Sequence, residues 1–208
     1  MTHIRHLSMP MSRADARSLA VGDLVTISGE IVITAGLPTH HRLVECARGE
    51  RAWPRPLTGA GFFHLGSCNV ERPDGSLDIL YMNPTTSTRF NPVMPELIRA
   101  FAPTAVGGKG GLDAACVAAM QDVGCVYLSF LGGGSALLSE AVREVVRVDW
   151  SDLIAHFRLV TLRVEGLGPL TVGIDAHGRS LYGDLSATAE ARLPAIMADL
   201  ARARDAAG

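Results

Sequence analysis

A run of hydroxyl side chains that ends in an arginine is the first place where this sequence could do chemistry. The segment reads Asn83-Pro84-Thr85-Thr86-Ser87-Thr88-Arg89. A helix is expected to begin within it, and the free amides at a helix N-terminus attract anions. A guanidinium can also hold a carboxylate through two parallel hydrogen bonds. The same hydroxyls suit a simple helix cap, so the pattern leaves a carboxylate site and a structural cap both open.

A glycine-rich loop around one cation is the second such place. It reads Gly107-Gly108-Lys109-Gly110-Gly111, twenty residues beyond Arg89 at its lysine. Glycines let the backbone approach a ligand closely, although their spacing is not that of a phosphate-binding P-loop. Lys109 is the single lysine among 19 basic residues. The loop is predicted either to bind an anion or to form an ordinary surface turn.

Two adjacent histidines followed by an arginine form the third pattern. His40, His41 and Arg42 lie in a segment that begins with Pro38 and is predicted to be helical. No carboxylate follows them until Glu45, so a metal site is not expected here. The pattern is more typical of an exposed helical turn.

The elements that must position these groups follow from hydrophobic periodicity. Strands are expected over 24–27, 30–34, 61–66, 77–82, 104–106, 125–130, 145–148, 158–164 and 170–174. Helices are expected over 38–48, 84–101 after an irregular start, 112–121, 135–142 and 185–204.

The alternation of strands, glycine loops and helices after residue 60 indicates an α/β fold. We expect a mixed or parallel sheet, an antiparallel layer and a layer of helices. Residues 1–20 read as an irregular arm, and 21–208 as one domain that ends in an amphipathic helix. Loops at the carboxyl ends of parallel strands gather into one crevice, so the hydroxyl run and the glycine loop are expected to meet.

Composition excludes several classes of protein. Of the 208 residues, 48% are hydrophobic and 19% are charged, against about 25% charged in typical soluble domains, so the chain is not disordered. A net charge of −2 gives no basic field for nucleic acid. With no signal-like segment and no stretch of about 20 apolar residues, we expect a cytoplasmic protein that does not enter a membrane.

The four cysteines do not indicate a metal site. They are Cys46, Cys68, Cys116 and Cys125, and none forms a CxxC pair. We expect most of them to be buried thiols, with Cys68 the most exposed.

Taken together, the motifs resemble the β subunit of class I fumarases and L(+)-tartrate dehydratase, which is equivalent to the C-terminal domain of single-chain class I fumarases. The residues that carry the resemblance are Gly22-Asp23, Ser28-Gly29-Glu30-Ile31, His40-His41-Arg42-Leu43, Pro84-Thr85-Thr86-Ser87-Thr88-Arg89, Gly108-Lys109-Gly110-Gly111, Gly168-Pro169-Leu170 and Ile174-Asp175-Ala176-His177-Gly178. They follow the family's order over roughly residues 20–185.

The resemblance implies a swivelling β/β/α domain that works with an α subunit. That α subunit would carry a four-iron–four-sulfur cluster, and this chain would itself bind no cofactor. The implied reaction is the reversible addition of water to an unsaturated dicarboxylate, carried out by an oligomeric enzyme. By motif position, the catalytic residues would be Thr85, as proton acceptor, and Lys109. The substrate-binding residues would be Thr86, Ser87, Arg89, Arg42, His40, Gly108 and Gly110.

One departure from the family's pattern leaves the function open. The family places an Arg-Asp pair where this chain has Gly36 and Leu37, and its arginine is a ligand of the substrate carboxylate. Losing such a charge-assisted contact costs about 1.5–3 kcal/mol. Either the substrate differs, or Arg42 or His40 compensates, or activity is weakened. The alternatives to an active hydro-lyase subunit are therefore a carboxylate-binding paralogue and a structural subunit.

Overall fold

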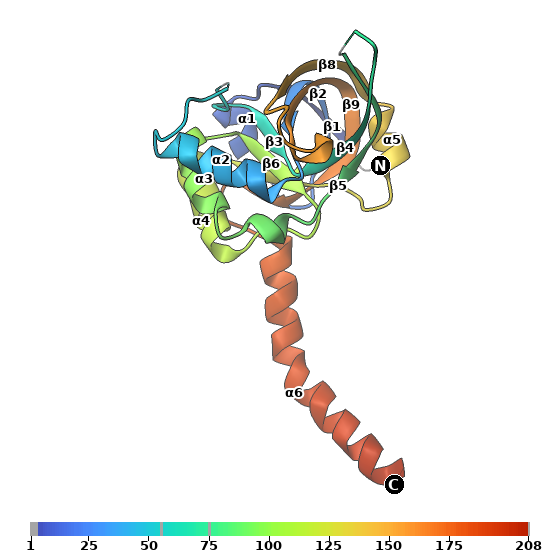
Figure 1. Cartoon of the computed structure of the whole chain (residues 1–208). Helices are drawn as coiled ribbons and strands as arrows, with labels where there is room; N and C mark the ends of the chain where they lie inside the picture. Colours follow the sequence, from blue (N-terminus) through green and yellow to red (C-terminus); the bar gives the residue numbers. More distant parts are fainter. Residues whose placement is uncertain (1–3, 55, 75, 208) are drawn as a thin grey trace.

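Seven strands of the described chain form one sheet that closes on itself (Figure 1). The computed structural model describes residues 4–54, 56–74 and 76–207. The strands are β1 (Ile4–Met9), β2 (Leu24–Ile33), β3 (Gly61–Phe63), β6 (Ala105–Gly108), β7 (Val126–Ser129), β8 (Val142–Asp149) and β9 (Leu159–Ile174). They pair in the order β1-β2-β3-β6-β7-β9-β8, and a further pairing between β2 and β9 closes a barrel. The strands from β1 to β7 in this order are parallel, whereas β9 is antiparallel to β2, β7 and β8.

Successive side chains along a barrel strand point to opposite faces, because a strand has a two-residue period. They therefore contribute alternately to two apolar cores. Phe63 and Leu128 join a cluster drawn from all sides of the barrel. Their neighbours Phe62 and Tyr127 join a second cluster with the helices. The barrel is therefore filled inside and covered by helices on one outer face.

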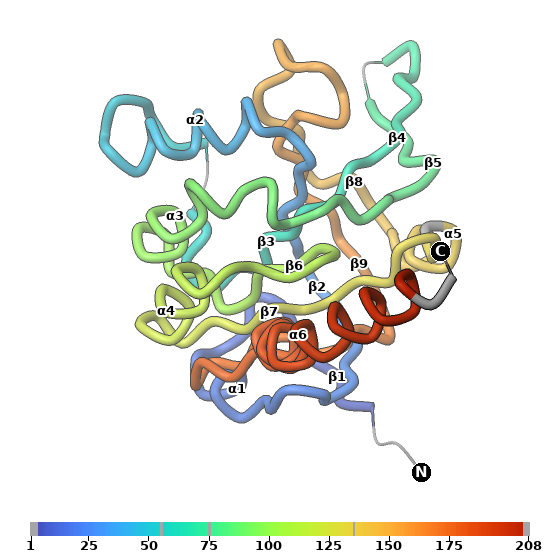
Figure 2. Tube along the Cα trace, turned by 90° about the horizontal axis from the view of Figure 1, so that it is seen from below, coloured from blue at the N-terminus to red at the C-terminus, as the bar shows by residue number. Residues whose placement is uncertain are grey.

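The helices are α1 (Arg13–Arg17), α2 (Leu37–Ala47), α3 (Met94–Phe101), α4 (Ala114–Val123), α5 (Ser135–Ser139) and α6 (Leu181–Ala207). Figure 2 shows α2, α3 and α4 together on one side of the molecule. The buried residues of α3 are Met94, Leu97, Ile98 and Phe101, which form the single stripe expected of a helix that covers a sheet. The helices, the parallel wall beneath them and the antiparallel strands opposite give three layers, so the α/β expectation is confirmed.

A two-stranded antiparallel ribbon stands apart from the barrel. Its strands are β4 (Leu65–Glu71) and β5 (Leu77–Pro84), and Figure 2 shows it on the side opposite α2 to α4. Two short 3₁₀ turns, η1 (Ser87–Phe90) and η2 (Ala155–Phe157), lie near its base. The ribbon and the turns form the walls of the site described below.

The first twenty residues are not an irregular arm, so that expectation is wrong for residues 4–19. β1 pairs in parallel with β2, and α1 follows it. The side chains of Met9, Met11, Ala16 and Leu19 are buried. Their burial supplies the free energy that orders this segment.

Two pairs of expected strands are in fact single strands. Residues 24–27 and 30–34 belong to β2, and 158–164 and 170–174 belong to β9, with register shifts where each strand was expected to break. Gly29 has φ 109° and lies against the backbone of Met9, where a Cβ would come within 2.2 Å of the carbonyl oxygen. A glycine at this point marks a bulge inside a strand and not its end.

The C-terminal helix α6 extends away from the body of the protein (Figure 1). It begins four residues earlier than expected and contains Pro194. Its larger apolar side chains are exposed, namely Leu185, Leu193, Ile196, Met197 and Leu200. The expected helix is present, but no face of it beyond residue 185 is buried within the described chain. None of the described helices is long and apolar enough to cross a membrane.

Candidate active site

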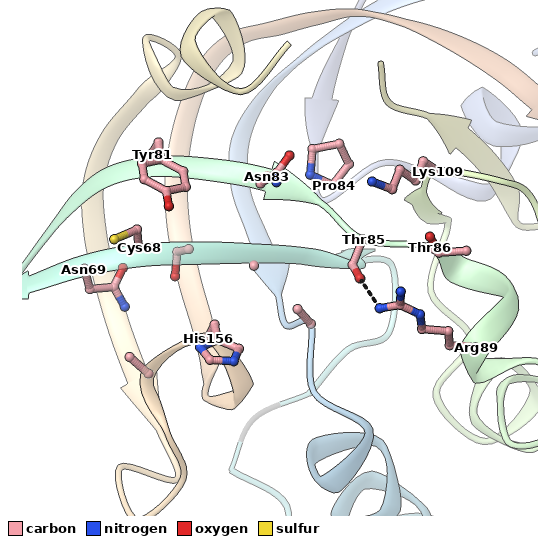
Figure 3. A pocket seen from close by; sticks show the side chains of 14 residues that line it. Cys68, Asn69, Tyr81, Asn83, Pro84, Thr85, Thr86, Arg89, Lys109 and His156 are labelled. Carbon is pink, nitrogen blue, oxygen red and sulfur yellow. Dashed lines mark hydrogen bonds between the residues drawn. The ribbon is translucent and has the colours of Figure 1, made fainter. Parts of the chain in front are cut away.

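Four of the predicted site residues line one open pocket of about 430 Å³, at the base of the β4–β5 ribbon (Figure 3). They are Thr85, Thr86, Arg89 and Lys109. The far part of the pocket is lined by side chains that the sequence did not single out as ligands, including Cys68, Asn69, Tyr81 and His156. The pocket therefore has the predicted cationic end and a second, polar end that carries no arginine or lysine.

Backbone hydrogen bonds bring the hydroxyl run and the glycine loop side by side. The amide of Thr85 donates to the carbonyl of His64 at 2.9 Å, and the amide of Lys109 donates to the carbonyl of Thr85 at 3.1 Å. The amide of Ser87 then donates to the carbonyl of Lys109 at 2.8 Å. These bonds form a short parallel bridge between Thr86 and Lys109, and the predicted meeting of the two loops is confirmed.

The segment after Thr86 does not begin an α-helix, so a helix N-terminus at the hydroxyl run is a wrong prediction. Residues 87–90 form one 3₁₀ turn, and α3 starts only at Met94. Pro95 explains the delay, because proline has no amide hydrogen and fits best in the first helical turn. Any anion held here must rely on side chains and single amides, without a helix dipole behind them.

The guanidinium of Arg89 points at the hydroxyl of Thr85. Its Nη1 donates to Thr85 Oγ1 at 3.4 Å, and the dashed line in Figure 3 marks this contact. A positive charge beside a hydroxyl favours its deprotonated form over the neutral one. Lys109 lines the same end of the pocket and adds a second cation that could neutralise a carboxylate.

Ser87 points away from the pocket, into the core. Its Oγ lies 2.8 Å from Nδ1 of His64 and 2.8 Å from the hydroxyl of Tyr127. The amide of Gly111 donates to the hydroxyl of Tyr127 at 3.3 Å. If each hydroxyl donates once, the hydrogen bonds run from Gly111 through Tyr127 and Ser87 to His64. Ser87 is fully buried, so its described contacts are with protein and not with a carboxylate in the pocket.

His40 is also buried beneath the pocket. Its Nδ1 donates to the carbonyl of Gly36 at 2.7 Å, and its ring stacks on Phe90 at 3.8 Å between centroids. Burial lowers the pKa of His40 to about 4. Burial, with His40 nearby, also holds the pKa of His64 well below its usual value. Both imidazoles are therefore neutral at pH 7, and neither is among the residues that line the pocket.

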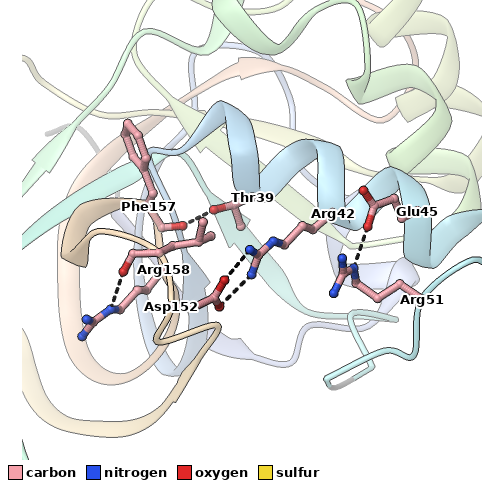
Figure 4. Close-up of polar contacts among 8 residues, drawn as sticks. Thr39, Arg42, Glu45, Arg51, Asp152, Phe157 and Arg158 are labelled. Atoms are coloured by element: carbon pink, nitrogen blue, oxygen red, sulfur yellow. Dashed lines mark hydrogen bonds and ion pairs between the residues drawn. The ribbon is translucent and has the colours of Figure 1, made fainter.

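Arg42 is held by a carboxylate outside the pocket (Figure 4). Its guanidinium donates to both carboxylate oxygens of Asp152, with Nη1 to Oδ1 at 2.9 Å, and its Cζ lies 5.8 Å from the Trp150 ring. The hydrogen bond from Arg42 lowers the pKa of Asp152. Neither Arg42 nor His40 is among the residues that line the pocket.

The two glycines predicted to contact substrate have different surroundings. A Cβ on Gly108 would lie 2.3 Å from Ser87 Oγ, so this glycine makes room for the buried hydroxyl. Gly110 has φ 84°, a left-handed conformation that favours glycine, and lies near Thr86. Neither residue lines the pocket that contains Lys109.

The described residues include no cluster of three or more histidine, cysteine, aspartate or glutamate side chains that could hold a metal. Cys46, Cys116 and Cys125 are buried, and Cys68 is half-buried in the pocket wall. Burial raises the pKa of the Cys116 and Cys125 thiols. The described cysteines therefore do not gather into the set of thiolate ligands that holds an iron–sulfur cluster.

His64, Tyr127 and His156 were missed by reasoning from the sequence. Tyr127 carried a usable signal, because a tyrosine in a strand predicted to be buried must find a partner for its hydroxyl. His64 carried the same kind of signal, because it lies in the strand expected over 61–66. His156 carried none, since it lies in a segment whose path depends on contacts far along the chain.

Residues 2–185 match the protein family described as "Fumarase C-terminus". The chain belongs to this family. A relative in Methanocaldococcus jannaschii, named "Putative L(+)-tartrate dehydratase subunit beta", is 32% identical over 177 residues, covering 85% of this chain and 90% of the relative. The L(+)-tartrate dehydratase subunit beta of Escherichia coli K12 is 30% identical over 86% of each chain. A Geobacillus stearothermophilus protein named "Putative fumarate hydratase class I" is 30% identical over 86% of this chain and 34% of its own length.

Proposed function

We propose that this chain is the β subunit of a hydro-lyase of the class I fumarase and tartrate dehydratase type. Together with an α subunit, it would catalyse the reversible removal of water from a small hydroxy-dicarboxylate. The observation that carries the proposal is the contact between the Arg89 guanidinium and Thr85 Oγ1 in a pocket that Lys109 also lines. The names of the family's relatives support the same reaction class.

The geometry suggests a division of labour among the three residues. In the dehydration direction, Thr85 Oγ1 would take the proton from the carbon next to the one that bears the leaving hydroxyl. The electron pair of that carbon–hydrogen bond would form the double bond as the carbon–oxygen bond breaks. Arg89 would stabilise the deprotonated Thr85 hydroxyl. Arg89 and Lys109, with the Thr86 hydroxyl, would hold the carboxylate beside the reacting carbon.

The four-iron–four-sulfur cluster is proposed to belong to the α subunit. When bound there, it would supply a Lewis acid for the substrate hydroxyl. At this end of the pocket, this chain would hold one carboxylate of the substrate and accept the proton. The open shape of the pocket leaves one side for a partner to cover.

A carboxylate-binding subunit without catalysis is the second candidate, favoured by the residue at position 36. A Cβ on Gly36 would lie 2.7 Å from Phe157 Cβ and 2.8 Å from Thr39 Oγ1. No arginine can project from this backbone without moving Phe157, so the arginine that the family places at this position has no counterpart here.

Co-expression with the cluster-bearing α chain under anaerobic conditions tests the two candidates. The purified complex would be assayed with fumarate, L-tartrate and mesaconate. The hydro-lyase proposal predicts turnover of at least one of them by the complex and none by the β chain alone. A stable complex that binds these acids but turns over none would support the binding subunit instead, and failure to form a complex would contradict both.

A further inference from the structure

The pocket is electrostatically asymmetric. Arg89 and Lys109 lie at one end, as Figure 3 shows, and Cys68, Tyr81 and His156 lie toward the other. Among the described residues that line this other end, His156 is the one basic side chain. A dicarboxylate that spans the pocket would therefore meet two cations at one carboxylate and an imidazole at the other.

The backbone on both sides of His156 is anchored to the protein. The carbonyl of His156 accepts the amide of Ala35 at 3.2 Å, and the amide of Phe157 donates to Ile154 at 2.8 Å. The carbonyl of Phe157 accepts the hydroxyls of Thr34, at 3.2 Å, and of Thr39 (Figure 4). These contacts fix the place from which the His156 side chain extends over the pocket.

The His156 ring is positioned but has free hydrogen-bonding capacity. It packs edge-on against Phe157, with 4.5 Å between ring centroids. Neither ring nitrogen has a hydrogen-bond partner among the residues that the structure describes, and the side chain is exposed to the pocket. An imidazole in this state can donate an N–H to a carboxylate.

Other basic groups near this end are committed elsewhere. Arg42 is paired with Asp152, and the guanidinium of Arg158 donates to the carbonyl of Leu153 at 2.9 Å. His40 is enclosed in the core. Gly66 in the adjoining strand keeps this part of the pocket open, since a Cβ there would come within 3.2 Å of Ala35 and 3.9 Å of His156.

We propose that His156 binds the carboxylate of the substrate that lies opposite the one held by Arg89 and Lys109. The inference rests on the proposed function for the identity of the ligand as a dicarboxylate. His156 is then a residue that determines specificity, because it distinguishes a dicarboxylate from an acid with one charged end. It makes no contribution to proton transfer at Thr85.

The test compares His156→Leu with His156→Gln in the holoenzyme, using a dicarboxylate substrate and its half-amide. The leucine variant is expected to raise KM for the dicarboxylate about tenfold or more while kcat changes little. KM for the half-amide, bound with its carboxylate at Arg89, stays close to the wild-type value. Glutamine retains an N–H donor and is expected to recover part of the loss. His41→Leu, on the exposed side of α2, is the matched control and leaves both KM values unchanged.

Two outcomes would overturn the inference: an unchanged KM for the dicarboxylate in His156→Leu, or an equal rise for both substrates, which would indicate a general disturbance of the loop. Calorimetric measurement of succinate and propionate binding separates failure of the role of His156 from failure of the hydro-lyase reaction. If wild-type holoenzyme turns over no acid but His156→Leu weakens succinate binding and not propionate binding, the hydro-lyase proposal fails and the role of His156 stands. If succinate binding is unaffected, the role of His156 fails whatever the turnover.

Discussion

Two faces of the segment 85–90 can be compared directly, because they carry similar side chains in different surroundings. Thr85, Thr86 and Arg89 line the open pocket, whereas Ser87 and Phe90 are buried. A hydroxyl on the pocket face meets a guanidinium and solvent. A hydroxyl on the core face sits between an imidazole and a phenol. Residue type alone therefore does not assign a role to the members of one motif.

The two faces are mechanically linked. The backbone amide of Ser87 takes part in the bridge that places Thr85 beside Lys109, and the side chain of the same serine makes the buried hydrogen bonds. Because only the core-face side chains are buried among other protein groups, we expect pocket-face substitutions to change turnover and leave stability intact. Core-face substitutions should change stability first.

Apart from replacement of the proton acceptor itself, the largest effect is expected from removal of the charge on Lys109. Lys109→Met keeps the length of the side chain but loses the cation, and should lower kcat/KM by about 10²–10³-fold, as for other charged groups that stabilise a reacting anion. The measurement is steady-state turnover of the holoenzyme, with the melting temperature as a check on folding. A folded Lys109→Met enzyme that keeps the wild-type kcat/KM would show that the charge of Lys109 has no role in the reaction.

The next largest effect is expected from acid, which should lower the free energy of unfolding through the buried histidines of the core face. His40 and His64 have lowered pKa values in the folded protein, so between about pH 6.5 and pH 4 the unfolded chain binds protons that the folded chain does not. Stability is fully present above this window and falls through it by up to about 1.4 kcal/mol per pH unit for each histidine.

Urea unfolding at a series of pH values measures this slope. His40→Phe should reduce it, and the exposed His41→Gln should leave it as in the wild type. A free energy of unfolding that does not change from pH 6.5 to pH 4 would show that the buried histidines do not titrate as the structure indicates.

Loss of the buried serine hydroxyl should have a moderate effect. Ser87→Ala leaves the Tyr127 hydroxyl and His64 Nδ1 without their shared partner, and is expected to lower the free energy of unfolding by about 1–3 kcal/mol. The matched control is Thr88→Ala, whose exposed side chain is adjacent in sequence. Equal unfolding midpoints for the two variants would contradict the division between faces.

The smallest effect is expected outside both faces. Arg42→Ala breaks the pair with Asp152, whose carboxylate is mostly exposed, so stability should fall by only about 0–1 kcal/mol. KM should not change, because Arg42 does not line the pocket. A large rise in KM for a dicarboxylate would show that Arg42 compensates for the missing arginine after all.

Much of the fold and part of the site could be predicted from the sequence. Hydrophobic periodicity predicted most strands and helices. The α/β topology predicted that residues 85–89 would lie beside the glycine loop. Closure of the barrel could not be predicted, because it depends on pairing between β2 and β9, far apart in the chain. The direction of the Ser87 side chain also escaped prediction, since it depends on a 3₁₀ turn where a helix was expected.

The role of Thr85 as the proton acceptor is tested by the effect of Thr85→Val on turnover by the reconstituted holoenzyme. Valine replaces the hydroxyl with a methyl group of similar size and leaves the buried contacts of Ser87 in place. We expect a fall in kcat of about 10²–10⁴-fold, the range for loss of a general base, with an unchanged melting temperature and nearly unchanged binding of a dicarboxylate inhibitor. A folded Thr85→Val enzyme that keeps its wild-type kcat would contradict the assignment of Thr85 as the proton acceptor.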